Sequence, residues 1–219
     1  MIKIPRDEVL RYMGYKNQKI EKSLNKKIDD IIIETERNLS VKYMYKLFDI
    51  VHLNDGVLIE GTNTVMYGED IKKHLSKCKK CILMAVTIGA NIERKIMALQ
   101  ISSINEAFIM DACATAAVES ACDELEVAIV NSINNSSITY RYSPGYGDFS
   151  IDFQPKLLSL LDAGKKIGLY VNQSNILTPR KSVTAVIGLL DECADNKLRK
   201  KNKCDLCENK ERCEFRKKC

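Results

Sequence analysis

The segment 81–89, CILMAVTIG, is a continuous apolar run of strand length that ends at Gly89. Such a run predicts a buried strand. Two helical stretches follow it, at about 91–99 and 104–131, and the second is rich in Ala, Ser and Cys, so that neighbouring backbone can approach it closely. A buried strand followed by a long helix indicates a mixed α/β protein with one substantial core.

Predicted helices and strands also alternate along the rest of the chain. Helices are predicted at 20–39 and 155–168, the second ending at Gly168. Short strands are predicted on either side of an Asp55-Gly56 turn within 51–68, at SITYRY (137–142), and in an antiparallel hairpin formed by 169–177 and 182–190. No Gly-x-Gly-x-x-Gly follows a strand and no P-loop is present, which argues against a doubly wound nucleotide fold.

Composition and charge restrict the protein class. Of the 219 residues, 45% are hydrophobic and 29% charged, and no apolar run reaches membrane-spanning length. The N-terminus lacks the apolar core of a signal peptide, so we expect a cytoplasmic protein with no membrane partner. The net charge of +5 arises in the tail, where 197–219 carry ten Lys and Arg against four Asp and Glu. Because no recognisable nucleic-acid-binding motif accompanies this tail, no nucleic-acid partner is expected.

The stretch RYSPGYGDF (141–149) follows the predicted strand 137–142 directly. It combines an arginine, a proline, two glycines, three aromatic rings and an acid, a combination that suits neither a helix nor a central strand. Glycines allow a ligand to approach the backbone closely, and loops that follow strands are frequent binding sites. We therefore expect a binding site in this loop.

A polar stripe lies on the long predicted helix, where Asp111, Thr115 and Glu119 repeat at four-residue intervals. An amphipathic surface helix would explain the same stripe without any function. Both interpretations remain open on spacing alone.

Four segments, in this order and spacing, resemble the activation domain of cobalamin-dependent methionine synthase: DACATAAVESACDEL, RYSPGYGDF, LLDAGKKIGLYVNQSNIL and PRKSVTAVIGL. The chain is still more similar to the free-standing activation-domain-like proteins of anaerobic bacteria. The resemblance implies an α+β fold in which helices pack around a twisted, largely antiparallel sheet. It assigns residues 1–196 to this domain and leaves 197–219 as a separate basic, Cys-rich tail.

The resemblance also implies a ligand and its contacts. In this family the domain binds S-adenosylmethionine, and the arginine, three residues, Gly-Tyr motif is matched by Arg141, Gly145 and Tyr146, with Pro144 inside the same loop. A guanidinium can pair in bidentate fashion with the carboxylate of the ligand. Glu119 matches the helix carboxylate that faces the positive end of the ligand. The sequence departs from the family at Ile187, where a ligand-contacting tyrosine is expected.

The C-terminal cysteines form a second candidate site. Cys204, Cys207, Cys213 and Cys219 follow a Cys-x2-Cys-x5-Cys-x5-Cys spacing that could ligate zinc or a 4Fe-4S cluster, or could remain free thiols. A cluster would offer a source of the electron that reductive activation requires. Cys78 and Cys81, in CKKC, are interpreted as ordinary thiols, with a redox or metal role as the alternative.

Two functions follow from the resemblance. The first is an S-adenosylmethionine-binding activator in a methyltransferase system, which supports reductive remethylation of cob(II)alamin on a methionine synthase or a related corrinoid protein. The second is a module that binds a corrinoid protein or delivers electrons without methyl transfer of its own. The partners implied are a cobalamin protein and a flavodoxin or ferredoxin electron donor.

Overall fold

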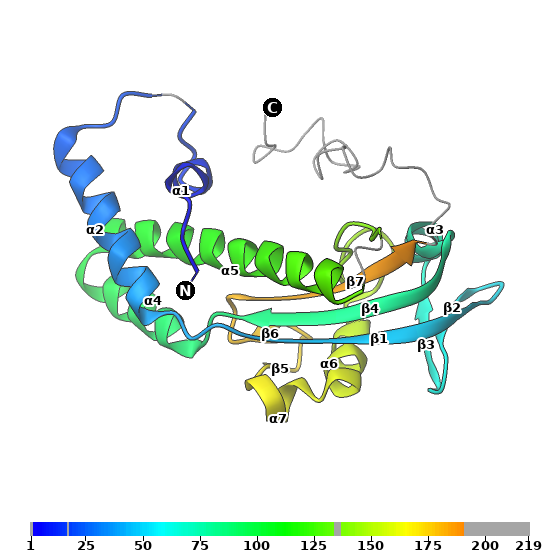
Figure 1. Ribbon diagram of the computed structural model, residues 1–219. Coiled ribbons are helices and arrows are strands. Elements are labelled where there is room, and N and C mark those ends of the chain that lie inside the picture. Colours follow the sequence, from blue (N-terminus) through cyan, green and yellow to red (C-terminus); the bar gives the residue numbers. More distant parts are fainter. Residues whose placement is uncertain (1, 17, 134–136, 191–219) are drawn as a thin grey trace. The chain divides into compact units, whose positions relative to one another are not determined.

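The computed structural model of the protein describes residues 2–16, 18–133 and 137–190 (Figure 1). These residues form two compact units. The first comprises the described residues of 1–42 with Val86–Leu125 and Leu177–Val183, and the second comprises Tyr43–Ala85, Glu126–Ile176 and 184–190. No helix in the described part of the chain is both long and apolar enough to cross a membrane.

A five-stranded sheet forms most of the second unit, in the order β3 (Thr64–Tyr67), β2 (Gly56–Ile59), β1 (Lys42–His52), β4 (Cys78–Thr87) and β7 (Ser182–Leu190). Its strands are antiparallel, with Ile50 opposite Ile59 in the β1–β2 pair and Gly56 opposite Tyr67 in the β2–β3 pair. β4 contains the predicted buried strand, since its residues from Cys81 onward are all buried. The expectation of a largely antiparallel sheet with helices around it is confirmed.

Helices of the second unit lie on both faces of this sheet. Consecutive strand residues point to opposite faces, and Tyr45 and Lys46 of β1 show which helices lie there. The Tyr45 hydroxyl donates to Ser132 Oγ at the end of α5 (Ile104–Ser132), whereas Lys46 Nζ donates to the Leu160 carbonyl of α6 (Gln154–Leu161). The last turn of α5 and helix α6 therefore cover opposite faces of β1, as Figure 1 shows.

The segment predicted as one helix at 155–168 forms two, α6 and α7 (Ala163–Ile167). Asp162 separates them because its backbone is left-handed, with φ of +58°. Gly168, with φ of +69°, ends α7 as predicted.

The predicted hairpin between 169–177 and 182–190 is wrong in its pairing. β5 (Tyr170–Val171) pairs with β6 (Leu177–Thr178) in a separate two-stranded sheet, and β7 instead lies beside β4. Pro179 follows β6 directly and has no N–H to donate, so it ends that strand before β7 begins.

SITYRY, predicted as a strand, forms a broken one along β7. Ile138 bridges Leu189 and Tyr142 bridges Val186, both antiparallel. Between these bridges the Thr139 side chain enters the ladder, because its Oγ1 accepts a hydrogen bond from the Gly188 N–H at 2.8 Å. A side-chain acceptor in place of a carbonyl interrupts the regular pairing.

The first unit is largely helical and contains α1 (Arg6–Tyr12), α2 (Lys22–Asn38), α4 (Ala90–Ser102) and most of α5. α2, α4 and α5 correspond to the helices predicted at 20–39, about 91–99 and 104–131. α2 buries the side chains of Ile28, Ile31, Ile32 and Thr35, and the Thr35 hydroxyl donates to the carbonyl of Ile31. Helices α1 and α3 (Glu69–Leu75) were missed, because seven residues give too few turns for a periodic signal.

Candidate functional site

The loop RYSPGYGDF forms a compact turn in the second unit. The Gly145 N–H donates to the Phe149 carbonyl at 2.7 Å, and the Phe149 N–H donates to the Tyr146 carbonyl at 3.0 Å. Gly145 and Gly147 have φ of +96° and +53°, which favour glycine. Phe149 and Pro144 are buried and fix the loop to the body of the unit, whereas Gly145 and Tyr146 are exposed.

Arg141 precedes this turn and forms an ion pair with Glu126 of α5. The Arg141 NH1 to Glu126 Oε1 distance is 3.0 Å, and the side chains are only 11% and 15% exposed. An ion pair this far removed from water is fixed in position, because either charge would be costly to leave without its partner.

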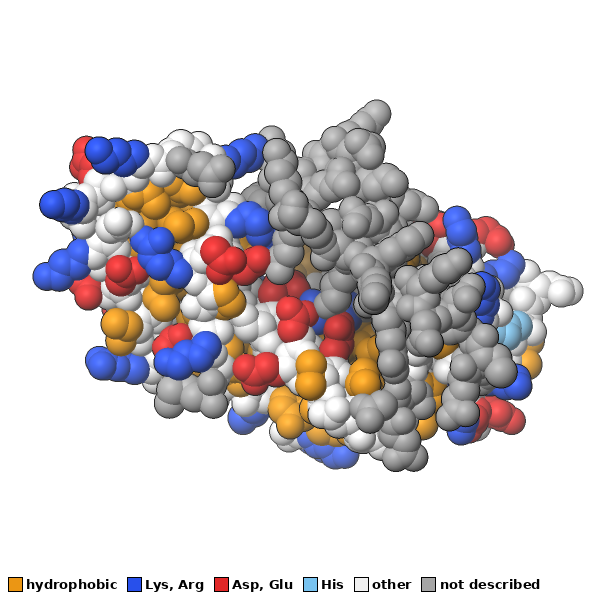
Figure 2. Space-filling model, turned by 45° about the horizontal axis from the view of Figure 1, so that its top comes forward, with side chains coloured by type: hydrophobic (Ala, Val, Ile, Leu, Met, Phe, Trp, Pro, Cys, Tyr) orange, Lys and Arg blue, Asp and Glu red, His pale blue; other side chains and the backbone are white. Residues whose placement is uncertain are grey.

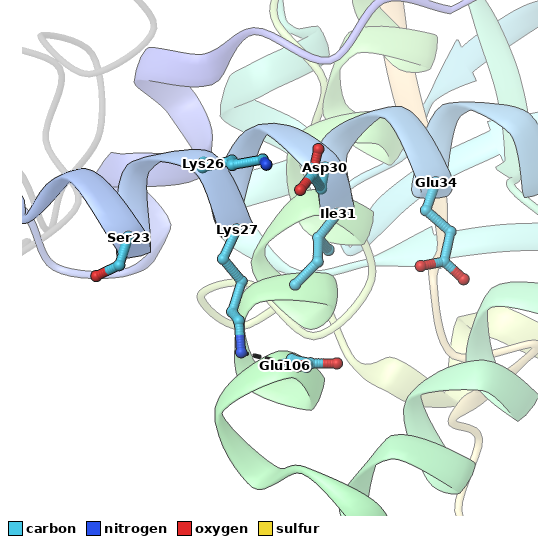
Figure 3. Close-up of a pocket in the computed structure, with 7 residues that line it drawn as sticks. All are labelled: Ser23, Lys26, Lys27, Asp30, Ile31, Glu34 and Glu106. Carbon is cyan, nitrogen blue, oxygen red and sulfur yellow. Dashed lines mark hydrogen bonds and ion pairs between the residues drawn. The ribbon is translucent and has the colours of Figure 1, made fainter.

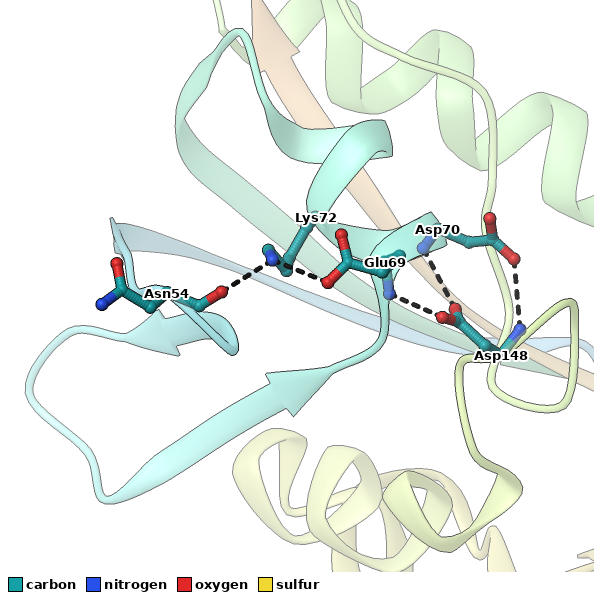
Figure 4. A network of polar contacts seen from close by, with 5 residues as sticks. All are labelled: Asn54, Glu69, Asp70, Lys72 and Asp148. Atoms are coloured by element: carbon teal, nitrogen blue, oxygen red, sulfur yellow. Dashed lines mark hydrogen bonds and ion pairs between the residues drawn. The ribbon is translucent and has the colours of Figure 1, made fainter.

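The other end of the loop is attached to α3 by Asp148 (Figure 4). Its carboxylate accepts hydrogen bonds from the backbone N–H groups of Glu69, at 2.6 Å, and Asp70, at 3.0 Å, while Asp70 Oδ2 accepts one from the Asp148 N–H. These backbone donors at Asp70 and Glu69 lower the pKa of Asp148. Lys72 extends the network by donating to the Glu69 carboxylate and the Asn54 carbonyl.

Gly147 is required by this network. A Cβ at position 147 would lie 2.0 Å from Asp70 Oδ2 and 2.7 Å from the Tyr142 hydroxyl oxygen. The glycine therefore allows α3 and the loop to approach closely, whereas at Gly145 a Cβ would meet nothing closer than Ile151 at 3.8 Å. Gly145 is solvent-exposed, and a Cβ there would make only ordinary van der Waals contact with Ile151.

An aromatic cluster lies beneath the loop. The rings of Tyr142 and Phe149 stack with centroids 6.2 Å apart, and Tyr142 also stacks on His74 at 5.1 Å. The Thr139 hydroxyl lies 2.9 Å from His74 Nε2. Burial lowers the pKa of His74 to about 4, so this imidazole is neutral at physiological pH. The cluster gives the loop a rigid, uncharged support.

Tyr146 is the most accessible aromatic residue of the loop, with 62% of its surface exposed. Its carbonyl accepts from the Tyr142 hydroxyl at 3.3 Å, which holds the backbone while the ring faces solvent. The second unit thus brings together four of the five predicted binding residues, Arg141, Pro144, Gly145 and Tyr146.

Glu119, the fifth, belongs to the first unit and lies near residues of α1 that the sequence did not single out. Burial and the negative charge of Glu119 raise the pKa of Tyr12. The Arg11 guanidinium lies over the Tyr12 ring, 4.2 Å from its centroid, and also pairs with Glu8. Only an unpredicted seven-residue helix brings these groups to Glu119, so no motif in the sequence pointed to them.

Asp111 and Thr115, on the same stripe, have a structural role. Lys181 Nζ lies 2.9 Å from Asp111 Oδ1 and 2.9 Å from Thr115 Oγ1. These contacts connect α5 to the start of β7 within the first unit. The interpretation of the stripe as an ordinary polar helix face suits these two residues.

Ile187 is fully buried in β7. The position at which the family pattern suggests a tyrosine is therefore a core position here.

The cysteine predictions have different outcomes. Cys204, Cys207, Cys213 and Cys219 lie outside the described residues, so the zinc and 4Fe-4S interpretations remain predictions. Cys78 and Cys81 are buried in β4, and burial raises the pKa of Cys81 to about 12, as expected of an ordinary thiol. Within residues 2–16, 18–133 and 137–190 no cluster of three His, Cys, Asp or Glu side chains could hold a metal ion.

A hollow of about 350 Å³ lies on the first unit, lined by Ser23, Lys26, Lys27, Asp30, Ile31, Glu34 and Glu106 (Figure 3). Lys27 pairs with Glu106 at 2.9 Å, and Glu34 pairs with Lys95 at 2.5 Å. Because these charges neutralise one another, the hollow offers a small-molecule ligand few convergent polar groups. On the face in Figure 2, described charged side chains of both signs are interspersed, as on an ordinary solvated surface.

Comparison with solved structures identifies the fold. A structure described as the MetH reactivation domain bound to AdoHcy superposes with a TM-score of 0.64 at 13% sequence identity, covering 87% of this chain and 78% of that one. The chain has the reactivation-domain fold. No family model and no curated protein matches the sequence. At this identity the similarity is one of fold, and within the reactivation-domain fold the loop 141–149 is the segment where predicted binding residues gather.

Proposed function

We propose that the protein binds S-adenosylmethionine through the loop 141–149 and supports reactivation of a cobalamin protein. The observation that carries this proposal is the arrangement of a nearly buried arginine, Arg141, beside an accessible glycine backbone at Gly145, in a fold shared with a domain solved with AdoHcy. AdoHcy is what S-adenosylmethionine becomes when its methyl group is transferred. A methyl donor is thus the ligand class most consistent with this fold.

The residues present fit the amino-acid end of such a ligand. The planar guanidinium of Arg141 can bind a carboxylate in bidentate fashion, and its contact with Glu126 fixes its direction before the ligand arrives. Gly145 offers backbone without a side chain, and the Tyr146 ring offers an exposed apolar surface. The family pattern also assigns Glu119 to the ligand, and that assignment stays a prediction.

Reactivation converts inert cob(II)alamin to methylcobalamin. It consumes one electron and the methyl group of S-adenosylmethionine, and it releases S-adenosylhomocysteine. In this proposal the chain holds the methyl donor, the cobalamin resides on a partner such as a methionine synthase or related corrinoid protein, and a flavodoxin or ferredoxin supplies the electron. The contribution of the chain is positioning.

Isothermal titration calorimetry with S-adenosylmethionine and S-adenosylhomocysteine tests the proposal. Both ligands should bind the wild-type protein. Arg141→Lys should weaken binding by roughly tenfold or more, because lysine keeps the positive charge but cannot bind a carboxylate in bidentate fashion. Arg180→Lys, at an exposed position of the first unit, is the matched control and should bind normally. Absence of binding to the folded wild-type protein would overturn the proposal, as would normal affinity in Arg141→Lys.

A further inference from the structure

One edge of the main sheet is open along most of β1. In the β1–β2 pair, β2 is opposite only Ile50, Val51 and His52, and one further bond joins the Glu60 N–H to the Asp49 carbonyl. From Tyr43 to Phe48, β1 has β4 on one side, and no strand among the described residues pairs with its other side. Figure 1 shows β2 and β3 beside only the far end of this long strand.

The direction of the backbone groups along this edge follows from the neighbouring bonds. The Asp49 carbonyl accepts from Glu60, and the Leu53 N–H donates to Gly56, so odd-numbered residues direct their N–H and C=O groups away from β4. Tyr43, Tyr45 and Leu47 therefore present three donors and three acceptors at the open edge. Such an edge is a template for another strand.

The side chains at this edge are apolar and accessible. Tyr43 is 52% exposed and Leu47 is 44% exposed, and both lie on the odd-numbered face of β1 with the half-buried Tyr45. Lys46, on the opposite face, is directed to the Leu160 carbonyl. The open stretch thus combines unpaired ladder positions with aromatic and branched side chains that favour strand pairing.

We propose that two copies of the protein associate through this edge, with the two β1 strands antiparallel and centred on Tyr45. In this register Tyr45 is opposite its counterpart, and Tyr43 is opposite Leu47 in both directions. These are the residues with outward backbone groups, so each of the three pairs exchanges two hydrogen bonds. The main sheet of one copy continues into that of the other.

Side-chain chemistry fits this register. The exposed Tyr43 ring meets the exposed Leu47 of the second copy, an aromatic–aliphatic cross-strand pair that stabilises antiparallel strands. On the other face, Met44 is opposite Lys46 and Lys42 is opposite Phe48, so no two like charges lie directly opposite each other. The edge is therefore complementary to itself, as a two-fold symmetric interface requires.

A second copy can pair every outward backbone group of this segment. A five-residue segment, 43–47, satisfies its own outward groups when it is reversed about its central residue. A contact of this size is small for a stable interface, so we expect a dimer that dissociates on dilution.

Sedimentation velocity over a concentration series, in reducing buffer, tests the proposal. The wild-type protein should show a monomer–dimer equilibrium, and Leu47→Pro should weaken dimerisation by roughly tenfold or more, since it removes one outward N–H from each copy. Because the Leu47 N–H points away from β4, proline spares the internal ladder. Leu47→Lys provides a second variant that keeps the backbone intact and charges the edge.

Ile101→Lys is the matched control, because Ile101 is 92% exposed on α4 and belongs to the first unit. It should dimerise like the wild-type protein. A wild-type protein that is monomeric at all concentrations would overturn the proposal, as would a dimer that persists in folded Leu47→Pro and Leu47→Lys.

Cross-linking tests the register. Under mild oxidation Tyr45→Cys should form a covalent dimer, because residues opposite each other in such a pair have Cα atoms about 5.5 Å apart. Tyr43→Cys should give only the wild-type background, since its counterpart would lie four residues away along the strand, about 13 Å. Equal cross-linking of the two variants would reject this register.

Discussion

The side chains of Asp148 and Asp70 each accept a hydrogen bond from the backbone N–H of the other residue. The Asp148 carboxylate accepts from the Asp70 N–H at 3.0 Å, and Asp70 Oδ2 accepts from the Asp148 N–H at 3.1 Å. This reciprocal arrangement resembles a capping box, but it joins a loop to a helix 78 positions away in the sequence. It fixes the end of the 141–149 loop opposite to Arg141.

Asp148→Ala should lower the stability of the protein in a pH-dependent way. The N–H donors of Asp70 and Glu69 lower the pKa of Asp148 below its ordinary value, so the carboxylate stabilises the fold at neutral pH and this contribution is lost as the pH falls through the lowered pKa. Thermal unfolding should show a midpoint lower by about 2–4 °C at pH 7, and this deficit should shrink as the pH falls through the lowered pKa. A deficit that does not change on acidification would contradict the role of the charge.

Gly147→Ala should be more destabilising than Gly168→Ala. Both glycines have positive φ, +53° and +69°, so both substitutions impose backbone strain of about 1 kcal/mol. At position 147 the new Cβ would also lie 2.0 Å from Asp70 Oδ2, whereas at 168 nothing lies within 4 Å. The difference in free energy of unfolding between the two variants, measured by urea denaturation, isolates the close approach of the loop to α3. Equal losses of unfolding free energy would mean that α3 moves away from the new Cβ at no measurable cost.

Arg141 and Glu126 should be strongly coupled in stability. Removing one partner of a nearly buried pair takes the opposite charge away from the other residue, so Arg141→Met and Glu126→Leu should each cost about 3 kcal/mol. The double variant should cost much less than the sum, because both charges are then removed. A double-mutant cycle by chemical denaturation measures this coupling, and additive effects would contradict it.

Cysteine labelling should distinguish buried thiols from reactive ones. Cys78, Cys81, Cys113 and Cys122 are buried, and burial raises the pKa of Cys81 and of Cys113 to about 12. A maleimide applied to the native protein at pH 7 should leave these four unmodified and label them after denaturation, as mapped by mass spectrometry. Rapid native labelling of Cys78 or Cys81 would instead support a redox role for CKKC.

The sequence predicted elements whose signals are local and strong. CILMAVTIG and the Ala-rich helix were predicted because a long apolar run and a long helical stretch each have few alternatives. The pairing of β7 was not predictable in the same way, since its neighbour β4 lies about 100 positions earlier in the chain. A nearby segment therefore appeared to be the simpler partner.

In the candidate site, too, the sequence predicted the residues of a local motif but not their partners from distant elements. Arg141, Gly145 and Tyr146 lie within six residues and form a motif, and the structure places Gly145 and Tyr146 in the turn that follows Arg141. Glu126 and Asp70 carry no motif, because their roles arise only when α5 and α3 meet the loop. Long-range ion pairs and caps of this kind depend on tertiary packing, which periodicity does not report.

The buried His74 should make stability depend on pH in a second window. Burial lowers its pKa to about 4 in the folded protein, whereas an unfolded histidine has a pKa of about 6.5. Between these values the unfolded chain binds the additional proton, so the free energy of unfolding should rise with pH from about 4 to 6.5, by up to about 3 kcal/mol.

His74→Gln isolates this effect, because glutamine can retain a hydrogen bond with Thr139 but does not titrate. Urea denaturation between pH 4 and 7 should give a flatter profile for His74→Gln than for the wild-type protein, with the two profiles converging in slope above pH 6.5. The aromatic support beneath the 141–149 loop would then be weakest in acid, because protonation of His74 places a charge between the Tyr140 and Tyr142 rings. Identical slopes would show that His74 is solvated in the folded protein.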